Sequence, residues 1–150
     1  MAFKKGKYCE VQLGTAKISG MGTWTLNGVS LAQLDETEFG DNWMHFSFGL
    51  GDGGTLSFNG IYDPDDSTGV ESLQQKNMNG TNITDIKMFI DSTSYYEPCQ
   101  TTGYFSPNST SGNDSEPSHV NITSWDINVD KAGLAQISFQ AKVSGCMVLV

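Results

Sequence analysis

The chain of 150 residues carries 17 acidic residues against eight lysines, has no arginine and has a formal net charge of −9. Proteins that grip nucleic acid neutralise phosphates with Lys and Arg, so this charge balance argues against a nucleic-acid-binding protein. No apolar run approaches the length of about 18 residues that a membrane-spanning helix needs, and we expect no membrane contact. The length fits one domain over residues 1–150.

The N-terminal part shows short strand patterns. Residues 8–13 and 17–19 alternate between apolar and polar side chains, which is typical of strands. Residues 23–26 form a clearer pattern, with Trp24 and Leu26 on one face. Residues 8–19 are therefore expected to form a strand or an N-terminal arm, and residues 23–26 to form a strand.

The next segment divides into an acidic stretch and two strand patterns. Residues 31–42 are predicted to form a long acidic loop. Residues 43–48 and 55–62 alternate as strands do, and the Gly-rich residues 49–54 between them predict a tight hairpin connection. The same glycines match the dinucleotide-binding pattern G-x-G-x-x-G, but that motif needs a helix after it, whereas a strand pattern follows here.

One helix is predicted, starting after the turn at residues 63–69. Val70, Leu73 and Asn77 fall on one helical stripe, which ends near Gly80. The acidic residues of this turn also permit a calcium loop, but an EF-hand starting at Asp63 would need Gly and Glu at its sixth and twelfth positions, where Thr68 and Gln74 stand. We therefore expect helix capping and no metal.

The rest of the chain predicts three strands and one long loop. In residues 82–90 the more apolar set should face the core: Thr84, Ile86, Met88 and Ile90. Residues 91–119 are rich in Ser, Thr, Asn, Gly and Pro and are expected to form a long polar loop. Residues 120–129 and 134–143 are two strong strand patterns joined by a short turn. The predicted fold is mainly β, an antiparallel β-sandwich or partly open barrel with one short α-helix.

The sequence offers little support for an enzyme. His45 and His119 are the two imidazoles, and neither lies in a recognisable nucleophile or zinc motif. Cys9, Cys99 and Cys146 are an odd, widely spaced set, which favours reduced thiols over a disulfide framework. No catalytic residue, cofactor or metal is expected.

An acidic segment with two large aromatics stands out from this background. It reads Leu-Asp-Glu-Thr-Glu-Phe-Gly-Asp-Asn-Trp over residues 34–43, and Gly54-Thr-Leu-Ser-Phe-Asn-Gly-Ile-Tyr-Asp63 follows it. Together the two pieces resemble the tail tube (major tail) proteins of long-tailed bacteriophages, in which a D-x-T-x-F-G-D-x-W loop precedes a Gly-bounded strand, a Tyr-Asp turn and one helix. The resemblance covers roughly residues 22–73.

The resemblance implies a set of contacts between stacked rings of subunits. The matching positions are Leu34, Asp35, Thr37, Phe39, Gly40, Asp41 and Trp43. Phe39 and Trp43 would be the apolar anchors and Gly40 would permit a sharp bend, while the two aspartates would fix the register by hydrogen bonds. The two ends of the chain add interface candidates because their apolar side chains would be a liability on a free monomer. These are Phe3, Tyr8, Met147 and Val148.

The function implied by the resemblance is that of a structural virion subunit. Such subunits assemble into stacked hexameric rings that form a tail tube for ejection of double-stranded DNA, in contact with tape-measure, tail-tip and terminator proteins. The expected location is the phage tail, after assembly in the bacterial host cytoplasm, and an acidic bore would repel the DNA. The alternatives from other classes are a sandwich-type carbohydrate-binding module with exposed tryptophans and a capsid decoration protein.

Overall fold

The computed structural model describes residues 6–99 and 118–150 of the chain. Its elements are a 3₁₀ turn at Gly6–Tyr8, one α-helix and eleven strands. The strands are β1 (Glu10–Leu13), β2 (Ala16–Lys17), β3 (Met21–Asn27), β4 (Ser30–Asp35), β5 (Phe46–Asp52), β6 (Thr55–Ile61), β7 (Ile86–Phe89), β8 (Tyr95–Pro98), β9 (His119–Asn128), β10 (Gln136–Ser144) and β11 (Met147–Leu149). Helix α1 spans Val70–Asn79.

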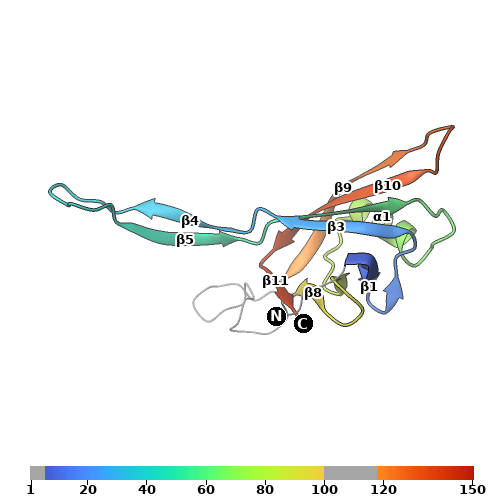
Figure 1. Cartoon of the computed structure of the whole chain (residues 1–150), viewed down its shortest axis with the longest axis horizontal. Helices are drawn as coiled ribbons and strands as arrows, with labels where there is room; N and C mark the ends of the chain where they lie inside the picture. Colours follow the sequence, from blue (N-terminus) through green and yellow to red (C-terminus); the bar gives the residue numbers. More distant parts are fainter. Residues whose placement is uncertain (1–5, 100–117) are drawn as a thin grey trace.

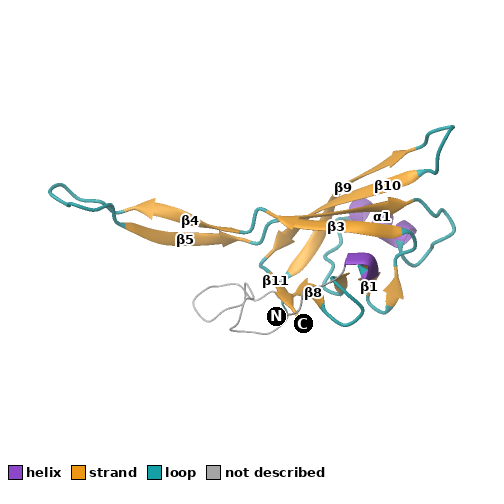
Figure 2. Ribbon diagram, in the orientation of Figure 1, coloured by secondary structure: helices purple, strands orange, loops and turns teal. Residues whose placement is uncertain are grey.

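Two antiparallel sheets form the body, and a long ribbon leaves it (Figure 1). One sheet has the strand order β11-β8-β7-β1-β2, and the other has the order β3-β6-β10-β9. Among the described residues, strands β4 and β5 pair only with each other, and they extend far from the body, as Figure 2 shows in the same view. The predicted class, mainly β and antiparallel with one short helix, is confirmed.

The core lies where the inner faces of both sheets meet the helix. Phe58 of β6 stacks on Phe139 of β10 with ring centroids 5.2 Å apart, in the middle of the four-stranded sheet. The register places Trp24 and Trp125 at the two ends of this aromatic row, where both pack against the core. The other sheet contributes Val11, Leu13, Ile86 and Met88 to the same buried cluster.

Helix α1 begins and ends where the sequence predicts. Val70 and Leu73 are its buried residues, and the Asn77 side-chain amide donates a hydrogen bond of 2.8 Å to the Ile122 carbonyl. Gly80 takes the left-handed conformation and closes the helix with a Schellman-type pair of hydrogen bonds. Asp66 serves the helix start, since its carboxylate accepts the Gly69 and Val70 amides.

Asp66 also accepts the Ser19 amide at 2.8 Å, which ties the helix start to the connection between β2 and β3. The acidic turn therefore supplies a side chain, Asp66, that accepts backbone amides at the start of the helix, as expected for helix capping. Within the described residues, no three His, Cys, Asp or Glu side chains gather in a way that could hold a metal ion.

The predicted hairpin between residues 43–48 and 55–62 is wrong. Strand β5 pairs with β4, and β6 instead pairs with β3 and β10. Residues 30–35 form a strand, so the predicted acidic loop shrinks to residues 36–45. Most of the Gly-rich residues 49–54 belong to strand β5, which ends at Asp52. The chain turns only after that, at Gly53 and Gly54.

Two further strand predictions need correction. In residues 82–90 the strand is short, and Ile83 and Phe89 are buried together with Ile86 and Met88, while Thr84 is exposed. The predicted polar loop at residues 91–119 contains β8, whose backbone pairs with β7 and β11. Residues 100–117 of that loop lie outside the described part.

The β9–β10 pair is confirmed, with a register shift at Gln140/Ala141. None of the described helices has the length and apolar character needed to cross a membrane.

Candidate assembly surface

The candidate site is the ribbon of β4, β5 and the connecting residues 36–45, named here the arm. Its register pairs Asp35 with Phe46 and Gln33 with Phe48, while Leu34 pairs with Ser47. Directly opposed residues of an antiparallel pair share a face, so Phe46 and Phe48 lie on one face and Leu34 lies on the other. Both faces of the arm therefore carry apolar side chains.

Because no second layer covers the arm, these side chains lie in solvent. The exposed apolar residues of the arm and its base are Val29, Leu31, Leu34, Phe39, Trp43, Met44, Phe46 and Phe48. Scattered exposed apolar residues are ordinary, but a contiguous set of this kind marks an interaction surface.

Hydrogen bonds hold the tip of the arm in one shape. The Glu36 amide donates to the His45 carbonyl at 2.8 Å, and the His45 amide donates to the Thr37 hydroxyl oxygen at 2.9 Å. The Thr37 amide donates to Asp35 Oδ1 at 2.9 Å, and Thr37 also holds the pKa of the Asp35 carboxyl below its usual value through hydrogen bonding. The tip is thus organised by the polar residues that the resemblance singles out.

A second group of contacts bends the end of the tip. Asp41 Oδ2 accepts the Glu38 amide at 2.7 Å and lies 3.8 Å from His45 Nε2. Gly40 has a φ of 95°, a conformation that side-chain-bearing residues rarely adopt. Gly40 therefore lies at a bend of the tip, and the hydrogen bonds that Asp35 and Asp41 accept here lie inside the arm.

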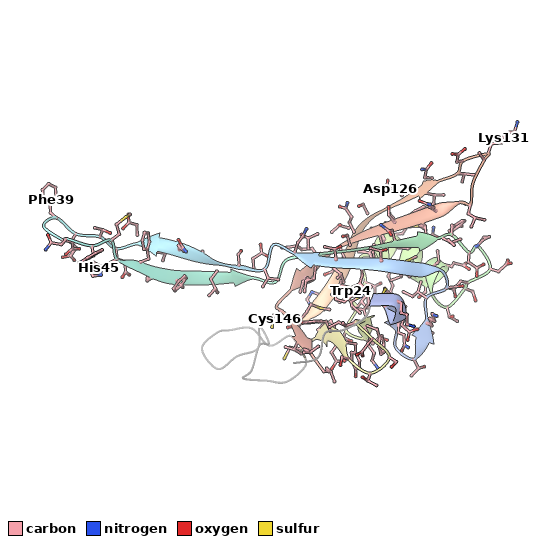
Figure 3. All side chains as sticks on the ribbon, viewed as in Figure 1. Trp24, Phe39, His45, Asp126, Lys131 and Cys146 are labelled. Atoms are coloured by element: carbon pink, nitrogen blue, oxygen red, sulfur yellow. The ribbon has the colours of Figure 1, made fainter. Side chains whose placement is uncertain are left out.

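The two aromatics are displayed outward on this frame. Phe39 is fully exposed (111%) and Trp43 is 81% exposed. Figure 3 shows Phe39 at the far end of the arm, with His45 beside the tip and Trp24 in the body. Exposing two large rings costs free energy unless another surface covers them.

The base of the arm is fixed to the four-stranded sheet. Lys142 of β10 forms an ion pair with Asp52 and donates to the Gly54 carbonyl at 3.2 Å. Hydrogen bonding to Lys142 and to the Gly54 amide lowers the pKa of the Asp52 carboxyl. A side chain at Gly53 would collide with the Gly145 carbonyl, so the chain passes close to the β10–β11 turn here. These contacts set where the arm leaves the body.

The remaining predicted interface residues that the structure describes lie away from the arm. Phe3 lies outside the described residues, and Tyr8 ends the 3₁₀ turn. Met147 and Val148 lie in β11 and are half-buried, and Met147 packs against the core. The structure therefore does not bring the predicted residues into one patch.

Sequence reasoning missed part of the arm. Val29, Leu31, Met44, Phe46 and Phe48 extend the apolar surface toward the body, and His45 belongs to the frame of the tip. The alternation of Met44, Phe46 and Phe48 was the available signal. This alternation predicts a strand, but alternation alone does not say which layer, if any, covers the apolar face.

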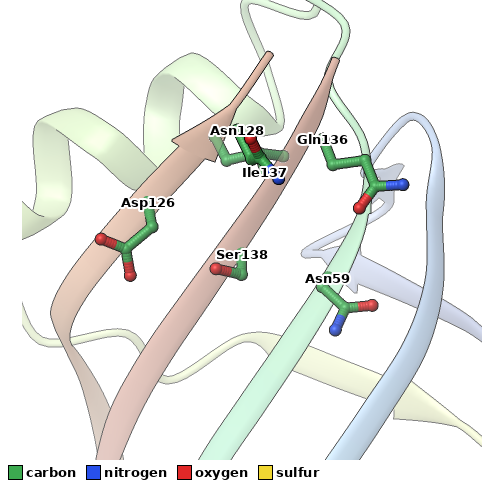
Figure 4. Close-up of a pocket in the computed structure, with 6 residues that line it drawn as sticks. All are labelled: Asn59, Asp126, Asn128, Gln136, Ile137 and Ser138. Atoms are coloured by element: carbon green, nitrogen blue, oxygen red, sulfur yellow. The ribbon is translucent and has the colours of Figure 1, made fainter. Parts of the chain in front are cut away.

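The four-stranded sheet offers a second surface, named here the open face, opposite the core. Its side chains come from alternate positions of the four strands. They are Thr23, Thr25, Asn27, Thr55, Ser57, Asn59, Ile61, His119, Asn121, Ser124, Asp126, Asn128, Gln136, Ser138, Gln140, Lys142 and Ser144. A depression of about 280 Å³ lies on this face. Figure 4 shows six residues that line it, from β6, β9 and β10.

The tryptophans do not share an exposed face. Trp24 and Trp125 are half-buried against the core, and the Trp24 indole donates a hydrogen bond of 2.8 Å to the Phe89 carbonyl. Trp43 lies on the arm and is exposed. A flat aromatic platform for sugar stacking is therefore absent from the described surface around these three residues.

No protein-family model and no curated protein matches the sequence. Solved structures do match the fold over nearly the whole chain. A chain of the native gene transfer agent virion has a TM-score of 0.69 at 16% identity and covers 99% of both chains. A chain of the empty gene transfer agent particle's tail, which has C6 symmetry, has a TM-score of 0.65 at 15% identity, covering 100% of this chain and 99% of that one.

A third similar structure comes from a different kind of particle. A chain of the sheath/tube terminator of an extracellular contractile injection system has a TM-score of 0.65 at 10% identity, covering 100% of this chain and 98% of that one. At these identities the likeness concerns the fold. The chain has a tail-tube-like fold, shared with proteins of phage-like tails and contractile injection systems.

Proposed function

We propose that this protein is a structural subunit of a phage tail tube, which joins copies of itself into stacked hexameric rings around a bore for double-stranded DNA. The observation that carries the proposal is the arm, a ribbon with apolar side chains on both faces that no part of its own described chain covers. The tail-tube-like fold supports the same conclusion.

The arm is built for contact with a neighbouring subunit. Phe39 and Trp43 are large, rigid side chains of the kind that dominate interface energies. The tip is pre-formed by its hydrogen bonds, so little ordering entropy is lost when it docks. We place this contact between successive rings, with Phe39 and Trp43 as anchors and with Leu34, Asp35, Thr37, Gly40 and Asp41 setting their positions.

The four-stranded sheet supplies the contact within a ring. Its two edge strands are β3 and β9, and in the described residues β3 pairs only with β6. An unpaired edge presents backbone donors and acceptors that invite another strand. If β3 of one copy lies along β9 of the next, the contact is heterologous, and rotation by one sixth of a turn closes a ring.

The proposed setting follows from this assembly. The subunit belongs to the virion tail, is assembled in the bacterial host cytoplasm, and meets tape-measure, tail-tip and terminator proteins at the ends and inside of the tube. DNA passes without being gripped, consistent with a net charge of −9. Its role is structural, with no catalytic step.

Assembly of two arm variants tests the proposal. Phe39→Ser and Trp43→Ser should abolish polymers seen by sedimentation and negative-stain microscopy while thermal unfolding stays unchanged. Met78→Ser is the matched control, because Met78 is a 72% exposed apolar residue on α1, away from the arm. Normal polymers from both arm variants would contradict the proposal.

A wild-type chain that stays monomeric and binds a glycan column would favour the carbohydrate-binding alternative. A wild-type chain that binds to preformed capsids would favour a capsid decoration protein.

A further inference from the structure

The open face of the four-stranded sheet is nearly free of charge, which is unusual in a chain with 17 acidic residues. All its positions are Ser, Thr, Asn or Gln except Ile61, His119, Asp126 and Lys142. Three consecutive rows of side chains cross the sheet from β3 to β9. They are Asn27-Thr55-Lys142-Asn121, Thr25-Ser57-Gln140-Ser124 and Thr23-Asn59-Ser138-Asp126.

The single cation of this face is neutralised in place. Lys142 forms an ion pair with Asp52 and also donates to the Gly54 carbonyl. The open face then keeps one carboxylate, Asp126 at the β9 end of the third row, and one imidazole, His119 at the start of β9. The carboxylates of the arm tip and of the acidic turn before α1 lie on other parts of the surface.

The position of this face in a ring follows from the two layers of the body. The helix and the five-stranded sheet pack on the core face, as shown by Leu73 and Met88 in the common buried cluster. A ring closed through β3 and β9 is a continuous curved sheet with one face toward the axis. The bulky layer of helix and second sheet fits the outer, wider side, so the open face is left for the bore.

We propose that the open face lines the bore and makes it a non-ionic wall of hydroxyl and amide groups. This inference rests on the proposed function and specifies the chemistry of its channel. It replaces the acidic lining expected from the net charge, because the carboxylates of the described residues lie mainly on other parts of the surface. A polyanionic double helix meets neither lysines that would hold it nor a row of carboxylates that would repel it.

The wall then acts through the absence of strong contacts. Side-chain hydroxyl and amide groups exchange hydrogen bonds with water at little net change in free energy. A phosphate of the moving DNA backbone should therefore bind no position on the wall much more strongly than the next. Interactions between the wall and DNA should also depend little on salt, because few counterions are held or released at an uncharged surface.

A thiol placed on the open face tests both the location and the charge of the wall. Ser138→Cys and Asn59→Cys are small changes at solvent-facing positions in one row. Gln75→Cys on the exposed side of α1 is the matched control for the outer surface. The unmodified chain gives the background from Cys9, Cys99 and Cys146.

In assembled tubes, the open-face thiols should react with a small maleimide but not with a maleimide on a long polyethylene glycol chain, whereas Gln75→Cys should react with both. Cationic and anionic thiosulfonate reagents of equal size then report the local potential. We expect the ratio of their rates at Ser138→Cys to change less than about threefold between unassembled protein and tubes at low salt.

The outcomes separate the two proposals. Absence of tubes from the unmodified chain overturns the proposed function and this inference with it. Tubes in which the bulky reagent reaches Ser138→Cys leave the proposed function standing and overturn the location. Tubes that shield this thiol but raise the cationic-to-anionic rate ratio more than about tenfold have an acidic bore, which overturns the non-ionic wall.

Discussion

The Thr37 hydroxyl oxygen accepts a hydrogen bond of 2.9 Å from the His45 backbone amide, and this contact closes the tip of the arm across its two chains. The same residue donates to Asp35, so one side chain links both sides of the tip. Phe39 and Trp43 lie between Thr37 and His45 in the chain. Their display therefore depends on Thr37.

Thr37→Val should raise the pKa of Asp35 toward its ordinary value of 3.8, because the hydrogen bonds from Thr37 are what lower it. A lowered folded pKa stabilises the tip above the ordinary value, and this stabilisation is lost as the pH falls through the folded pKa. Carboxyl chemical shifts measured by NMR across an acid titration give the midpoint. An identical midpoint in Thr37→Val and the unmodified protein would show that Thr37 does not set the charge of Asp35.

Trp43→Ala should leave the fold intact and hinder polymerisation. The indole is 81% exposed, so its removal takes little packing from the subunit but deletes a large apolar anchor from the interface. Circular dichroism checks the fold, and sedimentation velocity checks assembly. Met78→Ala, which removes a similarly exposed apolar side chain from α1, should assemble normally, and equal behaviour of the two variants would remove Trp43 from the interface.

Leu73→Ala should destabilise the subunit by about 2–5 kcal/mol, because Leu73 is fully buried between α1 and the sheets. Met78→Ala on the same helix should change stability by less than about 0.5 kcal/mol. Urea denaturation of unassembled protein measures both. Similar midpoints for the two variants would mean that α1 does not pack on the core as described.

Cys146 should resist alkylation in the folded protein. Burial, followed by the nearby Cys99 thiol, raises the pKa of the Cys146 thiol to about 11, and the thiolate is the reactive form. At mildly alkaline pH we expect iodoacetamide to modify Cys146 at least about tenfold more slowly in native than in urea-unfolded protein. Peptide mass spectrometry follows each site separately, and equal rates in both states would refute the shift.

Elements with a buried side were predictable from the sequence. The helix from Val70 to Gly80 and the β9–β10 pair each combine a one-sided apolar pattern with a clear turn or cap signal. Burial of one face fixes both the element and its register. The resemblance of residues 34–43 singled out the segment that forms the arm tip, but not the hydrogen bonds inside it.

The pairing of β4 with β5 was not predictable from the sequence. Neither strand packs on the core, so burial of one face does not determine which strand each pairs with. Phe46 and Phe48 alternate as a core strand would, and the glycines of β5 look like a turn. Only the paired backbone of β4 shows that they belong to a strand. Strand β8 was missed for a related reason, since its four residues lie in a polar stretch and join the sheet through backbone pairing with β7 and β11.

Negative-stain electron microscopy of the purified full chain, before and after concentration, tests self-assembly most directly. The account predicts rings with a central hole that stack into tubes. Uniform small particles at every concentration, with the arm's apolar side chains left in solvent, would contradict it.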